Sequence, residues 1–398
     1  MTTFKPADRV SFLKPYYFAS LTKKIEELRS KNVDIIRVDM GSPDLPPADF
    51  IIDELSTAAR MHTMHRYTPY GGSPAFRQAV ANYYQKRFAV DLNPATEIVG
   101  LIGSKEGLFH LSQILLDPGD LVLVPDPAYP VYKTSAAIAG ASTWKMPLLS
   151  ENDFLPDLNA IPDDIADKAR ILWLNYPNNP TGAVASLAFF EEVVAFAKQH
   201  HILIAQDAPY ADICFDDYIA PSILQISGAK DVVIEFNSLS KAYNMAGWRL
   251  GMGVGNSQIV QLLHTYKSQI DSSHFAPILS AGIAALTGDQ SWLADRNRIY
   301  QQRRDIVVDC LLELGFSLKT PPAAIYVWAQ LPVHFTDDFS FCNTLLEDTG
   351  VSITPGGVYG EFGAGYVRVS LGTSTPEISE AMHRLKEWFG MKGSQKPE

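Results

Sequence analysis

The sequence predicts an α/β protein in which helices cover both faces of a mainly parallel sheet. Apolar residues at helical spacing alternate with short apolar runs along most of the chain, an order typical of parallel strands joined by crossover helices. The chain has 398 residues and is 46% hydrophobic, so it can bury a large core and divide into two domains. We therefore expect a large α/β domain and a second, smaller one.

Helices are predicted at several places along this pattern. Apolar residues at helical spacing over 18–28 indicate an early amphipathic helix. Ser73 can cap a helix that begins with Pro74 and buries the apolar residues between 76 and 88. Long helical patterns run over 258–270 and 292–314, after which shorter elements resume.

Strands are predicted where short apolar runs are bounded by turn residues. These runs lie near residues 121–125, 143–148, 171–176, 201–206 and 232–237. The alternation of such runs with helical patterns favours parallel pairing. The change in pattern after residue 314 marks a second domain.

The charge and the cysteines of the chain indicate which partners and which cellular compartment to expect. The net charge of −11 comes from 44 acidic and 33 basic residues with no long run of either sign, which argues against nucleic acid or an anionic membrane as a partner. Cys214, Cys310 and Cys342 are widely spaced and read as buried thiols in a reducing compartment. Residues 1–14 are polar, and the chain has no apolar run of membrane length. We expect a cytoplasmic protein.

Two common classes of site are not expected. The glycines Gly251, Gly253 and Gly255 do not form the G-x-G-x-x-G fingerprint of dinucleotide binding, and they are typical of a close-packed strand. The nine histidines include no H-E-x-x-H arrangement, and the adjacent pair His200 and His201 diverges on a helix or a strand. No metal site is therefore predicted.

The most informative motif follows the apolar run 232–236. A lysine in a strand-to-helix loop, here Lys241, can lose its charge by desolvation and form a Schiff base with an aldehyde. Ser238, Ser240 and Arg249 offer the hydroxyl groups and the planar guanidinium that bind a phosphate. Pyridoxal 5'-phosphate carries both an aldehyde and a phosphate, so the motif predicts that cofactor. An exposed loop ending in a surface arginine is the alternative for the motif by itself.

Two further motifs end predicted strands. Asn179 follows the strand at 171–176, and Asp207 follows the strand at 201–206. Ligands bind beyond the carboxyl ends of the strands in such sheets, so Asn179, Asp207 and Lys241 can converge. From about residue 15 to residue 389 the chain resembles the class I and II aminotransferases, which are fold type I pyridoxal phosphate enzymes. Four separated motifs occur in that family's order and spacing.

The resemblance implies a particular architecture. The large domain would hold a mainly parallel seven-stranded sheet and would span about residues 50–290. The smaller α/β domain would be built from both chain ends, residues 1–49 and 291–398.

Lys241 and Asp207 are the predicted centre of the chemistry. Lys241 would tether the cofactor and then carry a proton, which requires burial and the nearby cation Arg249 to lower its pKa. We expect the other lysines to lie exposed. A buried carboxylate at Asp207 needs a partner, and a protonated pyridine nitrogen would serve, although an N-cap for a following helix is an alternative. The resemblance implies that Tyr210 and Asn179 bind the cofactor's phenolic oxygen.

Other residues would hold the cofactor. Ser104 and Lys105 precede a helical pattern, so their backbone amides can point at a phosphate at a helix N-terminus, although a simple capped helix would look the same. The resemblance assigns Tyr129 to stacking on the pyridine ring, where a lone tyrosine would otherwise be packing. It also implies that Tyr67 reaches the phosphate of a neighbouring subunit, and hence a homodimer.

Substrate binding is predicted at Arg368 and Gly41. Arg368 lies among apolar residues of a predicted strand, and a buried arginine needs an anion. The resemblance makes that anion the substrate α-carboxylate, whereas the residues by themselves favour a salt bridge within the protein. Gly41 matches a position whose backbone lies against the substrate.

The expected reaction is a two-stage transamination between an L-amino acid and a 2-oxo acid. A β-lyase or eliminase on the same scaffold remains an alternative, and so does a non-catalytic regulatory protein that binds the cofactor. Motifs at 14–18, 42–46 and 103–107 are similar to those of L,L-diaminopimelate, aspartate and alanine aminotransferases. The substrate-side loops 323–326 and 354–359 vary among such relatives, so the amino donor stays open.

Overall fold

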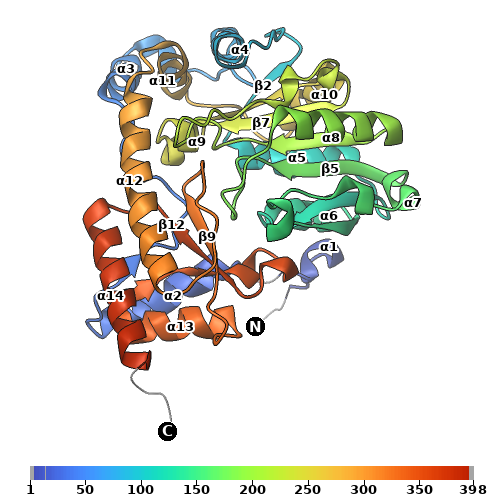
Figure 1. Cartoon of the computed structure of the whole chain (residues 1–398). Helices are drawn as coiled ribbons and strands as arrows, with labels where there is room; N and C mark the ends of the chain where they lie inside the picture. The colour runs from blue at the N-terminus through green and yellow to red at the C-terminus, as the bar shows by residue number, and fades with distance from the viewer. Residues whose placement is uncertain (1–3, 14, 394–398) are drawn as a thin grey trace.

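The computed structural model describes residues 4–13 and 15–393. Lys14 and the outermost ends of the predicted small domain therefore lie outside the described residues. Figure 1 shows two lobes, with the larger sheet and its helices above and a smaller set of strands and helices below. Helix α12 (Trp292–Glu313) runs alongside both lobes.

The upper lobe is built on a seven-stranded sheet with the order β2-β8-β7-β6-β5-β3-β4. Strand β8 runs opposite to the other six strands of this sheet, which confirms the prediction of a mainly parallel sheet of seven strands. The strands are β2 (Ile98–Leu101), β3 (Leu121–Asp126), β4 (Ser142–Pro147), β5 (Ala169–Asn175), β6 (Leu203–Asp207), β7 (Val233–Ser238) and β8 (Gly251–Gly255).

Helices pack around this sheet and complete the upper lobe. Ser73 caps α4 as predicted, since its side chain accepts a hydrogen bond from the Phe76 amide at 3.1 Å. Helix α11 (Ala276–Thr287), which was not predicted, packs beside α4 and α3 (Asp49–Ala59). The helices are α3 (Asp49–Ala59), α4 (Pro74–Phe88), α5 (Ser104–Leu115), α6 (Val131–Ile138), α7 (Asp163–Ala166), α8 (Leu187–His200), α9 (Leu239–Ala242), α10 (Ser257–Lys267) and α11 (Ala276–Thr287).

The lower lobe combines segments from both ends of the chain. Its strands form a parallel pair, β1 with β10, and an antiparallel sheet of order β11-β12-β9. The elements besides α12 are α1 (Asp8–Ser11), α2 (Tyr17–Ser30), β1 (Ile36–Arg37), β9 (Tyr326–Gln330), α13 (Asp338–Thr349), β10 (Val351–Ser352), β11 (Thr354–Pro355), β12 (Tyr366–Ser370) and α14 (Thr375–Gly393).

Short 3-10 helices connect many of these elements. They are η1 (His62–His65), η2 (Ser150–Asn152), η3 (Leu158–Ala160), η4 (Ile223–Gln225), η5 (Ala229–Asp231), η6 (Ala246–Trp248), η7 (Gly356–Val358) and η8 (Glu361–Gly363). None of the helices in the described part of the chain is both long enough and apolar enough to cross a membrane.

The two lobes have separate hydrophobic cores, and α12 belongs to both. Trp292 and Leu293 at its start pack against the core of the upper lobe. Val307 and Leu311 near its end lie in the core of the lower lobe, together with Tyr210 from the predicted large domain. The predicted domain boundaries at residues 50 and 290 stay a prediction. Helix α12 packs on both cores, and Tyr210 of the predicted large domain lies in the core of the lower lobe.

One expectation about the lysines is wrong. Lys267 at the end of α10 is fully buried, although we expected lysines other than Lys241 to lie exposed. Its ammonium bonds to Glu106 at 2.8 Å and to Asp271 at 2.8 Å, and these two carboxylates compensate the buried charge. Asp271 is only four residues from Lys267, but Glu106 is 161 residues away, and sequence periodicity does not reveal so distant a partner.

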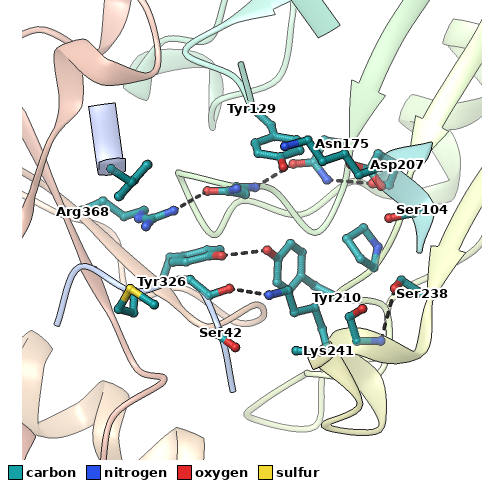
Figure 2. A pocket seen from close by; sticks show the side chains of 18 of the residues that line it. Ser42, Ser104, Tyr129, Asn175, Asp207, Tyr210, Ser238, Lys241, Tyr326 and Arg368 are labelled. Atoms are coloured by element: carbon teal, nitrogen blue, oxygen red, sulfur yellow. Dashed lines mark hydrogen bonds between the residues drawn. The ribbon is translucent and has the colours of Figure 1, made fainter. Parts of the chain in front are cut away.

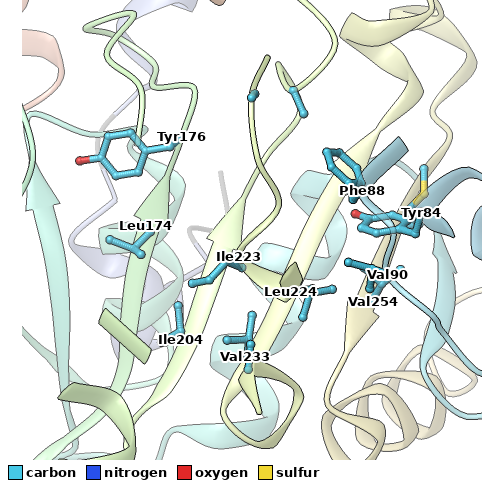
Figure 3. Close-up of a cluster of buried hydrophobic side chains, with 14 of the residues drawn as sticks. Tyr84, Phe88, Val90, Leu174, Tyr176, Ile204, Ile223, Leu224, Val233 and Val254 are labelled. Carbon is cyan, nitrogen blue, oxygen red and sulfur yellow. The ribbon is translucent and has the colours of Figure 1, made fainter. Parts of the chain in front are cut away.

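A buried polar network crosses the core of the upper lobe. Figure 3 shows Tyr84 among apolar side chains such as Phe88 and Val254. Its hydroxyl donates to the Glu235 carboxylate at 2.8 Å, and Ser222 donates to both oxygens of that carboxylate at 3.0 Å. Burial raises the pKa of Glu235 to about 7, because the charged form is poorly solvated there.

We expect Tyr84→Phe to destabilise the protein by about 1–3 kcal/mol, because it removes one donor from a buried carboxylate. Thermal unfolding of the variant measures this change. Tyr70→Phe is the matched control, because Tyr70 is 44% exposed. Equal unfolding temperatures for both variants would contradict the proposed importance of this hydrogen bond.

Candidate functional site

A cavity of about 730 Å³ lies between the two lobes at the carboxyl ends of β5, β6 and β7. Figure 2 shows side chains from both lobes pointing into it. Twelve of the thirteen predicted site residues line this cavity, and Tyr67 does not. The twelve are Gly41, Ser104, Lys105, Tyr129, Asn179, Asp207, Tyr210, Ser238, Ser240, Lys241, Arg249 and Arg368.

Lys241 lies in the one-turn helix α9 directly after β7. Its amine donates a hydrogen bond to the Gly41 carbonyl of the lower lobe. Burial, with a smaller contribution from the positive charges of Arg368 and Arg249, lowers the pKa of Lys241 to about 8. Arg249 was predicted as the neighbouring cation, and Arg368 is a second one. A substantial fraction of this amine is therefore neutral near pH 8.

Asp207 ends β6 with one carboxylate oxygen satisfied and one unsatisfied. Its Oδ2 accepts a hydrogen bond from the Tyr132 hydroxyl at 2.8 Å, while Oδ1 is buried without a partner. Burial raises the pKa of Asp207 to about 7, and the bond from Tyr132 opposes that rise. No helix begins at Asp207, so its alternative role as an N-cap is wrong. The free oxygen is suited to a protonated ring nitrogen.

Asn175 is a site residue that the sequence analysis missed. It ends β5 directly beside Asp207 in the sheet register. Its amide donates to the Asp207 carbonyl at 2.7 Å, and its Oδ1 accepts from the Asn179 amide at 2.8 Å. This side chain joins two predicted site residues. A polar residue near the end of an otherwise apolar run was the signal that could have found it.

The end of the cavity that we predicted to bind a phosphate is formed by three segments. Ser104 and Lys105, which we expected just before a helix, are the first two residues of α5, so the first backbone amides of that helix are available to an anion. Arg249 Nη1 lies 3.3 Å from Ser240 Oγ, beside Ser238. Gly103 has a φ of 75°, and a Cβ there would collide with the Arg249 guanidinium. Only a glycine therefore leaves this guanidinium room beside the helix start.

Arg368 lies in the middle of β12 and is buried. Its guanidinium donates to Asn179 Oδ1 at 2.9 Å and to the Asp39 carbonyl at 2.8 Å. Within residues 4–13 and 15–393, no carboxylate forms an ion pair with Arg368, so the alternative of an internal salt bridge is wrong. The Arg368 Nε atom is buried without a partner. This cation is suited to an anion that enters from outside the protein.

Tyrosines form the wall between the amine and the guanidinium. The Tyr210 and Tyr326 hydroxyls lie 2.8 Å apart, and the Tyr326 ring centre is 4.2 Å from the Arg368 guanidinium carbon. A Cβ at Gly41 would lie 2.6 Å from the Tyr326 hydroxyl oxygen, which explains the glycine. Tyr326 belongs to the segment 323–326 that we expected on the substrate side, but its contacts with Tyr210 and Arg368 were not predicted.

Tyr129 and Lys105 lie on the upper side of the cavity. Tyr129 packs edge-on against Tyr132, with ring centres 6.0 Å apart. The Lys105 amine lies 5.7 Å from the Tyr129 ring centre and 5.6 Å from that of Tyr16. A cation between two aromatic rings is favourable. Tyr67 is 90% exposed, and its predicted contact with a neighbouring subunit stays a prediction.

No cluster of three or more metal-ligating side chains was found among the residues that the structure describes. The polar groups of the cavity are instead those suited to an organic ligand with a phosphate, a ring nitrogen and an aldehyde. Asp207 has a free buried oxygen, Ser240 and Arg249 flank the start of α5, and Lys241 carries an amine of lowered pKa. The residues present therefore fit pyridoxal phosphate.

Comparison with known proteins gives consistent matches over nearly the whole chain. Residues 33–385 match the family described as aminotransferase class I and II. A protein of Moorella thermoacetica named LL-diaminopimelate aminotransferase is 50% identical over 384 residues, which cover 96% of this chain and 98% of that protein. A protein of the same name from Dehalococcoides mccartyi is 48% identical over 381 residues, with coverage of 96% and 98%.

Solved structures give the same result for the fold. Substrate-bound BacF of Bacillus subtilis superposes with a TM-score of 0.92 at 36% identity, and the match covers 98% of each chain. A probable N-succinyldiaminopimelate aminotransferase of Thermus thermophilus has a TM-score of 0.88 at 37% identity, covering 93% of this chain and 99% of that one.

The two cations beside Lys241 lead to a test in the protein freed of cofactor. Labelling of Lys241 by an amine-reactive reagent should have a midpoint near pH 8, because only the neutral amine reacts. Arg249→Gln and Arg368→Gln should each move that midpoint to higher pH, since a neighbouring positive charge disfavours the ammonium form. Peptide mass spectrometry across pH 6–10 measures the labelled fraction.

Exposed Lys168 in the same samples is the internal control, and its labelling should not change with either substitution. An unchanged midpoint for Lys241 in both variants would contradict the electrostatic account.

Proposed function

Because the chain belongs to the class I and II aminotransferase family, and is therefore a pyridoxal-phosphate-dependent transaminase, we propose that its amino donor is LL-diaminopimelate. The amino group would pass to a 2-oxo acid in a second half-reaction. Relatives that carry this name are 44–50% identical along nearly their whole length, which supports the donor. The residue roles below are part of the same proposal.

One observation carries the assignment of the site. The Lys241 amine and the Arg368 guanidinium open into the same cavity, and among the described residues neither has a carboxylate partner. An amino acid brings a carboxylate for the arginine and places its α-carbon near the lysine. Such a pair of groups is what proton transfer at an α-carbon requires.

The cofactor would be held along one side of the cavity. Ser104, Ser238, Ser240 and Arg249 would bind its phosphate, with backbone amides of Lys105 and its neighbours. Tyr129 would cover the face of its ring. Bound pyridoxal phosphate supplies an aldehyde that takes up amino groups and a ring that accepts the electrons released with the α-proton.

Asp207 would keep the ring nitrogen protonated. Its buried Oδ1 gains a positive partner on binding, which stabilises the carboxylate form that burial otherwise disfavours. Tyr210 and Asn179 would donate hydrogen bonds to the cofactor's phenolic oxygen. Asn175 would hold this arrangement, because it bonds to the backbone of both Asp207 and Asn179.

Lys241 would move the proton of the reaction, taking it from the donor's α-carbon. Its pKa of about 8 leaves a usable fraction of neutral base at neutral pH. Arg368 would bind the α-carboxylate in two hydrogen bonds and so orient the bond that breaks. Gly41 would leave its backbone open on the substrate side.

Assembly and location complete the proposal. Tyr67 is exposed and absent from the cavity of its own chain, which supports a role at the site of a second subunit in a homodimer. Cys310 and Cys342 are buried as expected, whereas Cys214 is only partly buried. All three carry free thiols, which supports a reducing compartment such as the cytoplasm.

A panel of amino donors tests the proposed function. LL-diaminopimelate, L-aspartate and L-alanine are each assayed with 2-oxoglutarate and with pyruvate. We expect kcat/KM for LL-diaminopimelate to exceed the others by at least about tenfold, which corresponds to about 1.4 kcal/mol in transition-state binding. Lys241→Ala is the control and should lose nearly all activity.

A higher kcat/KM with aspartate or alanine would overturn the donor and leave the family unchanged. Release of ammonia from a β-substituted amino acid, faster than amino transfer, would instead support a β-lyase. A protein that binds the cofactor but acts on no donor would support a regulatory role.

The shared site can be tested by mixing two inactive variants. Lys241→Ala and Tyr67→Ala proteins are unfolded together in equal amounts and refolded. Random pairing makes about half of the dimers mixed, and in each of these one site is intact, so about a quarter of all sites recover. Activity should rise toward that fraction of the wild-type value.

Each variant refolded by itself is the control. No recovery, with mixed dimers confirmed by mass, would exclude a site shared through Tyr67. If Tyr67→Ala stays active by itself, its loss of cofactor on dilution replaces activity as the measurement.

A further inference from the structure

Helix α12 contains three buried arginines, and two of them, Arg296 and Arg303, lie on one face of the helix. Arg296 and Arg303 are seven residues apart, which is two helical turns and about 10.5 Å of rise. Each is 3% exposed. The start of this helix lies on the core of the upper lobe and its end lies in the core of the lower lobe, as Figure 1 shows. The two arginines lie on the same side of the helix, but at different heights, so each contacts a different lobe.

Arg296 holds the turn that carries Lys241. Its guanidinium donates to the carbonyl of Ala242, the residue after Lys241, and to the carbonyl of Asp212 at 2.6 Å. Helix α9 is a single turn, and the last carbonyls of a helix need partners from outside it. Arg296 is such a partner. It also ties this turn to the segment that follows Asp207 and Tyr210.

The second contact of Arg296 is itself fixed. The Asp212 carboxylate bonds to Arg87 Nε at 3.0 Å and to the Tyr83 hydroxyl at 2.7 Å, and both of these residues belong to α4. Within the described part of the chain, Arg296 forms no ion pair with a carboxylate. Besides the two carbonyls, its guanidinium donates to the side-chain oxygen of Asn297 at 2.8 Å. Burying a cation with only neutral partners costs several kcal/mol of desolvation, which suggests that Arg296 has a specific role.

Arg303 holds the opposite side of the cavity. It forms two hydrogen bonds with Asp44, at 2.7 and 2.9 Å, and a third with the Leu371 carbonyl at 3.0 Å. Leu371 directly follows β12, which carries Arg368. Asp44 belongs to the segment that begins with Gly41, whose carbonyl accepts the bond from Lys241. Arg303 therefore fixes the backbone on the substrate side.

We propose that Arg296 and Arg303 are positioning residues that set the separation between the Lys241 amine and the Arg368 guanidinium. Two turns of one rigid helix fix the spacing of the two guanidinium groups, and each group fixes the backbone next to one of those two side chains. The proposal rests on the roles assigned above to Lys241 and Arg368. A substrate whose carboxylate is bound by Arg368 then presents its α-carbon to Lys241 at one distance.

The two arginines should have different effects on the reaction. Loss of Arg296 frees the Lys241 turn, which affects proton transfer and the surroundings of the cofactor. Loss of Arg303 frees the end of β12, which affects carboxylate binding. A purely structural role would lower the stability in both cases without separating kcat from KM.

The test compares Arg296→Met and Arg303→Met with Arg298→Met in the holoenzyme. Arg298 is on the same helix with its side chain 74% exposed, so it is the matched control. For each protein, kcat and KM are measured with the best donor found, together with the pH midpoint of cofactor absorbance and the dissociation constant of succinate, a dicarboxylate that is not a substrate.

We expect Arg296→Met to lower kcat about ten- to hundredfold and to shift the absorbance midpoint, with KM changed less than about twofold. Arg303→Met should raise KM and the succinate dissociation constant about tenfold, with kcat and the absorbance midpoint nearly unchanged. Arg298→Met should match the wild type. Identical profiles for the two buried variants, or wild-type values in both, would overturn the proposal.

Two further measurements keep the outcome interpretable. If Arg296→Met does not fold, Arg296→Lys keeps the charge and one donor, and it should still lower kcat while KM is preserved; wild-type kcat in this variant would also overturn the proposal. Borohydride reduction of each holoenzyme, followed by peptide mapping, shows whether the cofactor is attached to Lys241. Attachment to another lysine would be a failure of the proposed function, separate from a failure of this inference.

Discussion

Burial of the Lys241 amine without an acidic partner is the constraint on which the site depends. Desolvation and two arginines lower its pKa to about 8, whereas a nearby carboxylate would restore the charge and remove the base. The nearest acceptor is instead a neutral carbonyl, that of Gly41. Asp207, the carboxylate that lines the cavity, is bonded to the Tyr132 hydroxyl and not to this amine.

The same principle explains the other charged groups of the cavity. Asp207 receives one hydrogen bond from Tyr132 and keeps one oxygen free, while Arg368 donates to an amide and a carbonyl and keeps Nε free. Each group is held firmly enough to be oriented but remains incompletely satisfied. Incomplete satisfaction of buried polar groups is unfavourable for folding, and it favours a ligand that completes it.

Much of this site could be predicted because polar residues that follow apolar runs identify the active edge of a parallel sheet. Asp207 and Lys241 were found in this way. Asn175 was not found because it is the last residue of its strand and does not follow it. The role of Tyr326 depends on its contact with Tyr210, and the burial of Lys267 depends on its contact with Glu106, and both contacts join distant segments. Periodicity describes one element at a time, so it does not reveal that Arg368 contacts Asn179 or that Tyr132 contacts Asp207.

The reversed direction of β8 affects how the cofactor loop is ordered. Because β8 is antiparallel to β7, Ser238 pairs with Gly251, and residues 239–250 leave the sheet and return to it at the same level. The loop that carries Lys241 and Arg249 is thus closed at its base by strand hydrogen bonds. Folding of the sheet already restricts the loop, so ligand binding has less conformational entropy to remove. The pairing of β7 with β8 therefore fixes the positions of both ends of the loop before any ligand binds.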